Sequence, residues 1–67
     1  SVFPNPTTGV FEISGDAIQS VEILNITGSS IRRQKEASCD ISDLPAGVYF
    51  VKIKYQGGSV TRKLFKN

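Results

Sequence analysis

The stretch "DLPAGVYFVKIKY", residues 43 to 55, is the densest run of strand-forming residues in the chain. From Tyr49 to Tyr55 every second residue is apolar or aromatic, which is the period of a strand with one buried face. The residues predicted to face a core are Tyr49, Val51, Ile53 and Tyr55. Before them, Leu44, Pro45 and Gly47 set a turn, and Gly47 suits a backbone conformation that a Cβ would disfavour. The segment predicts a sandwich strand preceded by a shaped turn.

Similar short alternations recur along the chain, separated by Gly, Pro, Asn, Asp or Ser, and no segment keeps a helical period for three turns. Strands are predicted near residues 2–3, 9–14, 19–25, 30–35, 38–41, 48–55 and 60–66. This spacing is typical of antiparallel β-sandwiches. A chain of 67 residues has room for one domain, so residues 1–67 are expected to form a single all-β sandwich of about seven short strands.

The last two predicted strands are joined by "YQGGSV", in which Gly57 and Gly58 suit a two-residue primed turn. Centred there, the hairpin pairs Tyr55 with Val60 and continues in that register. The pairs expected on the core face are Ile53 with Arg62, Val51 with Leu64 and Tyr49 with Lys66. Those on the outer face are Lys54 with Thr61, Lys52 with Lys63 and Phe50 with Phe65. The outer face is either a solvated surface whose lysines discourage aggregation, or a docking surface formed by Phe50, Lys52, Lys54, Lys63 and Phe65.

Charge is unevenly distributed, although the net charge of +2 is too small to indicate nucleic-acid binding. Residues 1–43 hold all six acidic residues and three basic ones, whereas residues 44–67 hold five basic residues and no acidic one. No apolar run approaches the roughly 20 residues of a membrane span, and no leader resembling a signal peptide is present. Any export signal of that kind is therefore expected on a larger precursor.

Residues for catalysis or cofactor binding are scarce. The chain has no histidine, its carboxylates are scattered, and it contains neither a phosphate-binding loop nor a dinucleotide-binding turn. The single cysteine, Cys39, excludes an internal disulfide, and its alternation with Ile41 predicts a small buried hydrophobe rather than a reactive thiol. No enzymatic activity and no cofactor or metal are expected, which leaves recognition, structure or addressing.

Two loop segments have alternative interpretations. "VFPNPTTGVFEI" at the start contains Pro4 and Pro6, which stiffen the chain and favour a rigid lead-in along a sheet edge. The alternative interpretation is that this segment marks a boundary with an upstream protein. "NITG" matches a glycosylation sequon at Asn25, but the same residues are those that a tight turn selects, and the turn is favoured.

Taken in order, four segments resemble the type A C-terminal sorting domains of proteins exported by the type IX (Por) secretion system of Bacteroidetes. They are "VFPNPTTGVFEI", "VEILNITGSSI", "ISDLPAGVYFVKI" and the basic end "TRKLFKN", and together they span nearly the whole chain. The family's motif positions fall on Pro4, Asn5, Pro6, Gly9, Gly28, Leu44, Gly47, Tyr49, Lys63 and Lys66. Asn67 departs from the pattern, because many members end at or beside the basic residue.

The resemblance implies an Ig-like, Greek-key sandwich at the C-terminus of a secreted precursor. An outer-membrane translocon would recognise the domain in the periplasm and send the attached cargo to the cell surface or medium. A sortase-like peptidase would then remove the domain at or before Ser1. The domain itself would catalyse nothing, and neither nucleic-acid binding nor stable membrane insertion is expected.

Two other functions fit a small secreted sandwich. One is a binding module of the fibronectin type III or carbohydrate-binding kind, since "LPAGVY" also resembles the turn before a tyrosine-corner strand. The other is a structural domain that shields the edge of a neighbour. The lack of tryptophan is unusual for a carbohydrate-binding platform.

Overall fold

Residues 2–67 are described by a computed structural model, and within them the chain forms strands and turns without a helix. The strands are β1 (Val2–Phe3), β2 (Val10–Ile13), β3 (Ile18–Leu24), β4 (Ser30–Gln34), β5 (Ser38–Asp40), β6 (Gly47–Tyr55) and β7 (Gly58–Lys66). Each lies within two residues of a strand expected from the sequence. The prediction of an all-β fold with seven short strands is confirmed.

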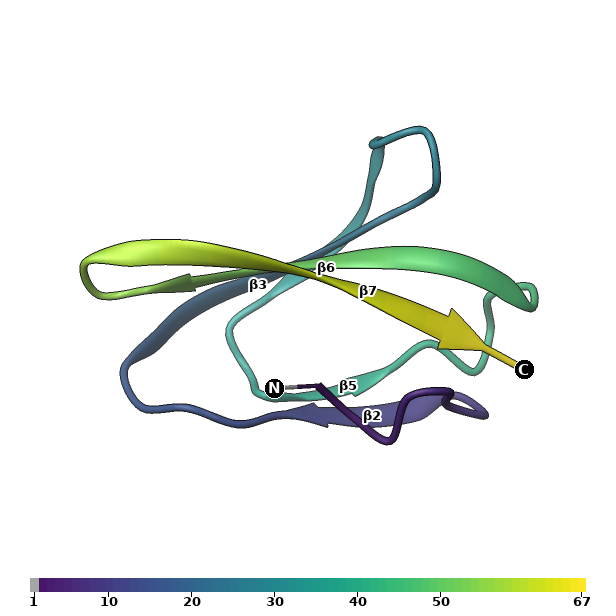
Figure 1. Cartoon of the computed structure of the whole chain (residues 1–67), viewed down its shortest axis with the longest axis horizontal. Coiled ribbons are helices and arrows are strands. Elements are labelled where there is room, and N and C mark those ends of the chain that lie inside the picture. The colour runs from purple at the N-terminus through teal and green to yellow at the C-terminus, as the bar shows by residue number, and fades with distance from the viewer. Residues whose placement is uncertain (1) are drawn as a thin grey trace.

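Two antiparallel sheets form the sandwich (Figure 1). One has the strand order β1-β2-β5, and the other has the order β4-β3-β6-β7. The chain crosses between sheets after β2, after β4 and again after β5, so β2 pairs with β5 and β3 pairs with β6. Such non-sequential pairing is the mark of a Greek-key arrangement.

The core lies between the two sheets and is built by alternation along the strands. In β6 the buried residues are Tyr49, Val51 and Ile53, which confirms the face predicted from the sequence, and Tyr55 packs against their cluster while half-buried. The other core residues are Phe11, Ile13, Val21, Ile23, Cys39, Ile41 and Leu64. Burying each of the larger ones contributes roughly 1.5–3 kcal/mol.

The β6–β7 hairpin corrects the register expected from the sequence. Tyr55 pairs with Gly58, so the two turn residues are Gln56 and Gly57 rather than Gly57 and Gly58. Gly57 takes a positive φ of 98°, whereas Gly58 does not and becomes the first residue of β7. The expected centre was wrong because it assumed a primed turn with positive φ at both positions.

Every cross-strand pair of the hairpin is therefore two residues away from the expected one. Tyr49 lies opposite Leu64 and Val51 opposite Arg62 on the core side. On the outer side Lys52 lies opposite Thr61 and Phe50 opposite Lys63, so the two expected pairs Lys52–Lys63 and Phe50–Phe65 do not form. A shift of two residues leaves each side chain on the face that was predicted for it.

Candidate functional site: the signal end of the sandwich

The side chain of Asn5 occupies the place of a missing strand beside β7. Its Nδ2 donates to the Lys63 carbonyl oxygen at 2.8 Å, and the Phe65 N–H donates to its Oδ1 at 3.0 Å. These groups belong to alternate residues of β7 that point away from β6. One side-chain amide thus pairs with both an acceptor and a donor of the β7 edge, which lie 58 and 60 residues away in sequence. Pro4 and Pro6 flank it, each after a cis peptide bond.

Thr7 extends this pairing to the end of the chain. Its N–H donates to the Phe65 carbonyl oxygen at 2.8 Å, and the Asn67 N–H donates to the Thr7 carbonyl oxygen at 2.8 Å, which makes a parallel bridge to Lys66. The Thr7 side chain is fully buried, and its Oγ1 donates to the Val10 carbonyl oxygen and accepts from the Gly9 N–H. Thr7 was missed by the sequence analysis, although a threonine two residues before a glycine in a turn is a pattern that could have indicated it.

Gly9 anchors the other side of the same segment. Its carbonyl oxygen accepts from the Ile41 N–H at 2.7 Å, and a Cβ built on it would lie 2.6 Å from Ser42 Oγ. With φ at +156°, the position is also strained for any side chain. Gly9 therefore lets the N-terminal segment approach the loop that precedes β6.

The turn before β6 is fixed by a tyrosine corner. Tyr49 Oη donates to the Pro45 carbonyl oxygen at 2.6 Å, a bond that ties the start of the strand to its own approach. Leu44 is half-buried against the core, and its N–H donates to the Ile41 carbonyl oxygen at 2.9 Å. Gly47 has φ at +152°, and nothing lies within 4 Å of its hypothetical Cβ, so conformation rather than crowding explains the glycine.

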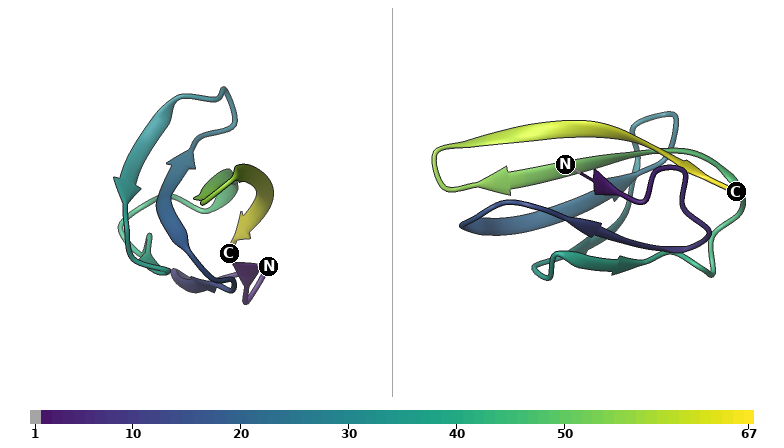
Figure 2. Two further views of the ribbon diagram at one scale, coloured as in Figure 1. Left: turned by 90° about the vertical axis from the view of Figure 1, so that its left-hand side faces the viewer. Right: turned by 60° about the horizontal axis from the view of Figure 1, so that its bottom comes forward.

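Three groups of predicted motif residues meet at one end of the sandwich. Gly47 pairs with Lys66, Tyr49 pairs with Leu64, and Thr7 bridges to Lys66. Figure 2 shows the purple segment after β1 beside the yellow end of β7. We call this region, residues 4–9, 44–49 and 63–67, the signal end. Gly28 lies apart from it, in the exposed turn of the β3–β4 hairpin that projects away from the sheet in Figure 1.

The β3–β4 turn shows how the structure uses the sequon-like residues. Asn25 Oδ1 accepts from the Thr27 N–H, the Thr27 hydroxyl and the Ser29 N–H, and the Gly28 N–H donates to the Asn25 carbonyl oxygen at 2.9 Å. Gly28 has φ at +89°. The interpretation of "NITG" as a tight turn is confirmed.

The predicted docking face lies on the outer side of the four-stranded sheet. Lys63 lies opposite Phe50, and its Nζ is 5.2 Å from the centre of the Phe65 ring, within the range of a cation–π contact. Phe65 is 44% exposed, while Phe50 is half-buried. Lys52 and Lys54 are exposed further along β6. The face is continuous with the signal end through Lys63 and Phe65.

Glu22 of β3 lies beside the docking face, on the same side of the sheet. It lies opposite Lys52, and Arg33 approaches its carboxylate at 3.4 Å. A hydrogen bond from Ser30, together with the charges of Arg33 and Lys52, lowers the pKa of Glu22. A hollow of about 180 Å³ here is lined by Ser20, Glu22, Arg33, Lys52 and Lys54, three of which are cations.

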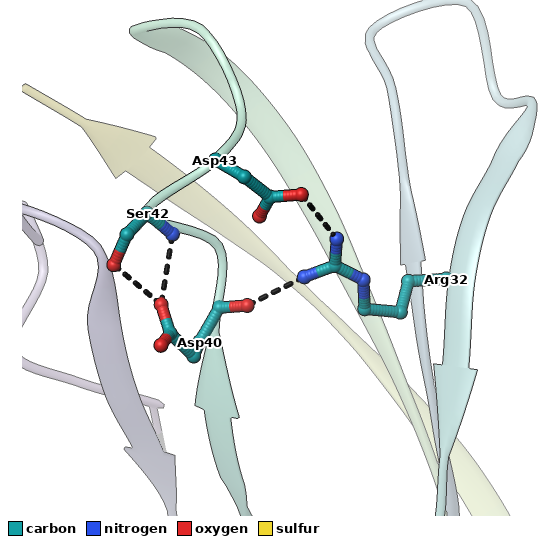
Figure 3. Close-up of polar contacts among 4 residues, drawn as sticks. All are labelled: Arg32, Asp40, Ser42 and Asp43. Carbon is teal, nitrogen blue, oxygen red and sulfur yellow. Dashed lines mark hydrogen bonds and ion pairs between the residues drawn. The ribbon is translucent and has the colours of Figure 1, made fainter.

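Arg32 joins the two sheets where β4 and β5 face one another (Figure 3). Its guanidinium donates to the Asp40 carbonyl oxygen at 2.5 Å and to Asp43 Oδ2 at 2.9 Å. Asp40 in turn accepts from both the N–H and the hydroxyl of Ser42. Hydrogen bonds from Ser42 lower the pKa of Asp40, and the bond from Arg32 lowers that of Asp43. These contacts hold the loop that carries Ser42 against Gly9.

Cys39 behaves as the sequence predicted. Its side chain is buried in the core, and burial raises the pKa of its thiol to about 11. Such a thiol stays protonated near neutral pH and is a poor nucleophile. Within residues 2–67, no group of three or more cysteine, aspartate or glutamate side chains is arranged to hold a metal ion.

A family model described as "Secretion system C-terminal sorting domain" matches residues 1–67, the whole chain. The chain belongs to this family. The resemblance noted in the sequence is thereby confirmed, and the chain is a C-terminal sorting signal for type IX secretion. Such a signal implies an attached upstream cargo, an interaction with the secretion machinery and export across the outer membrane. Sorting-signal domains are not normally catalytic.

A search of curated proteins found no match to the sorting domain. In residues 2–67 there is no helix with the length and apolar character needed to cross a membrane.

Proposed function

We propose that the outer-membrane translocon of type IX secretion recognises the folded signal end of this domain and thereby moves the attached cargo to the cell surface or medium. The observation that carries the proposal is the pairing of Asn5 with Lys63 and Phe65. It unites the opening motif and the basic C-terminal segment in one surface. A receptor for that surface would read a three-dimensional epitope rather than a linear tail. The motif residues proposed to form its surface are Pro4, Asn5, Pro6, Leu44, Gly47, Lys63 and Lys66, and the buried Gly9 and Tyr49 would support them from beneath.

The docking face formed by Phe50, Lys52, Lys54, Lys63 and Phe65 would extend this epitope across the sheet. Exposed cations beside an exposed aromatic ring suit a partner that offers carboxylates around an apolar contact. Continuity with the signal end supports this choice, because Lys63 belongs to both surfaces.

After export, a sortase-like peptidase would remove the domain at or before Ser1, as the family resemblance implies. The position of β1 supports such a cut, because a bond upstream of Val2 can be cleaved without removing any of the seven strands. The domain would then leave as a folded unit.

The alternative of a fibronectin-like or carbohydrate-binding module gains one observation, the tyrosine corner formed by Tyr49 and Pro45. That feature belongs to the sandwich fold, and fold alone does not assign function. Phe3 and Phe65 are the exposed aromatic rings among the described residues, 48% and 44% exposed. A glycan-binding assay on the isolated domain separates this alternative from the sorting function.

The decisive experiment joins residues 1–67 to the C-terminus of a reporter that carries a periplasmic export signal. In type IX-competent cells the reporter is expected at the surface or in the medium, and in cells lacking the translocon it should stay in the periplasm. Retention in competent cells, with the domain folded, would contradict the proposal. Loss of reporter stability alone on deletion of the domain would instead indicate a structural role.

A further inference from the structure

The outer edge of β7 is covered along only part of its length. Residues 63, 65 and 67 use outward-pointing backbone groups to pair with Asn5 and Thr7. By the same alternation, the N–H and C=O groups of Ser59 and Thr61 and the N–H of Lys63 also point outward. One of these groups, the Thr61 carbonyl oxygen, accepts a long hydrogen bond of 3.4 Å from the Arg62 guanidinium.

An open strand edge is a template for strand addition. The first half of β7 is extended and runs directly into the half that the N-terminal segment already covers. Its side chains are exposed at Ser59, Thr61, Arg62 and Lys63, and half-buried at Val60. Apart from the long Arg62 contact with the Thr61 carbonyl oxygen, no hydrogen bond within residues 2–67 uses this part of the edge, so a strand of three or four residues could pair with it without displacing Asn5.

The charge of the edge selects the kind of strand. Arg62 and Lys63 lie on opposite faces of β7, and residues 58–66 contain no acidic residue. A second copy of the same edge would bring two more cations close to them, which is unfavourable. An extended segment bearing Asp or Glu on both of its faces would place a carboxylate near each cation.

We propose that residues 59–63 of β7 accept an extended acidic segment of the secretion machinery by backbone strand addition. This inference rests on the proposed function, since it names how one part of the translocon would hold the signal. Backbone pairing would supply affinity, and the cations would supply selectivity for acidic partners.

The test is Thr61→Pro in the reporter fusion described above, with Thr61→Val as the matched control. Proline removes an N–H that points away from β6, so the hairpin keeps its own hydrogen bonds, and proline is tolerated on such edges. Export by the unmodified fusion first establishes the sorting function. Thr61→Pro is then expected to lower export at least tenfold while Thr61→Val leaves it unchanged.

Folding is checked by the thermal midpoint of each purified domain. If Thr61→Pro lowers it by more than about 5 °C, Ser59→Pro, which also removes an outward N–H, replaces it. Arg62→Glu is expected to reduce export more than Arg62→Gln, because it adds repulsion to an acidic segment. Export of the folded proline variant at the unmodified level would overturn the inference. So would a dimer of the purified domain that the proline variant abolishes, because the edge would then serve self-association.

Discussion

The carboxamide of Asn5 pairs with β7 as a residue of a neighbouring strand would, accepting from the Phe65 N–H at 3.0 Å and donating to the Lys63 carbonyl oxygen at 2.8 Å. The motif at the start of the sorting domain is thus held by the backbone of its last strand. Loss of the carboxamide would leave the Phe65 N–H and the Lys63 carbonyl oxygen without this partner. This pairing explains how residues about 60 positions apart could act as one signal.

Asn5→Ala should detach residue 5 from Lys63 and Phe65 without unfolding the domain, because Thr7 still pairs with Phe65 and Asn67. Two exposed hydrogen bonds are lost, each worth about 1 kcal/mol, so the free energy of unfolding should fall by about 1–2 kcal/mol. For a domain of this size that corresponds to a fall in Tm of about 4–16 °C. Hydrogen exchange of the Phe65 amide should accelerate, while that of core amides in β6 such as Ile53 stays slower. Unchanged exchange at Phe65 would show that the contact does not form in solution.

Gly9→Ala should destabilise the domain far more than Gly58→Ala. A Cβ at Gly9 meets Ser42 Oγ at 2.6 Å in a backbone conformation unfavourable to side chains, whereas nothing lies within 4 Å at Gly58, whose φ is ordinary. The expected cost at Gly9 is about 1–3 kcal/mol, from crowding and strain together. Urea unfolding of both variants measures the difference. Equal midpoints would mean that the segment moves away from Ser42 at no cost.

Stability should fall in acid through Asp40 and Asp43. Their pKa values are lower in the folded domain than in the unfolded chain, so their contribution is complete above about pH 5 and disappears as pH drops through the folded values. Arg32→Ala removes the main cause of the shift at Asp43. Its Tm should therefore be lower than that of the unmodified domain at pH 7, and the gap should narrow near pH 2. A gap that is constant with pH would exclude the Arg32–Asp43 pair as its source.

Charge reversal should test the docking face separately from the fold. Lys52→Glu combined with Lys54→Glu changes two exposed residues of β6, at a mild cost in stability because residue 52 lies opposite Glu22. Reporter export should fall several-fold while Tm changes by only a few degrees. Glu12→Lys, an exposed change on β2 in the other sheet, is the control and should leave export unchanged. Full export by the double variant would contradict the docking role and indicate that the face is a solvated surface.

The seven strands and the core face of β6 could be predicted because hydrophobic alternation is local information. The hairpin register could not, because either pair among Gln56, Gly57 and Gly58 could form the turn, and only the geometry shows that Gly57 alone takes a positive φ. A turn is chosen by how well the flanking strands then pair, which depends on the whole sheet.

The signal end was predicted as separate motif residues rather than as one site. Nothing local to Asn5 indicates that its carboxamide reaches Lys63 and Phe65, since that contact depends on the path of the chain between the sheets. Thr7 has a local signal for its turn, the glycine two residues later, but its burial arises only when the N-terminal segment closes over β7. Gly28, grouped with the others by resemblance, lies in a different turn with its own local role.

The most direct measurement is the fraction of reporter at the cell surface for fusions carrying the unmodified domain, Asn5→Ala and Gly58→Ala, with Phe65 amide exchange recorded for each purified domain. The predicted result is that Asn5→Ala, folded but with rapid exchange at Phe65, is retained in the periplasm, while the unmodified and Gly58→Ala fusions reach the surface. Full surface display of Asn5→Ala despite rapid exchange at Phe65 would contradict recognition of a joined signal end.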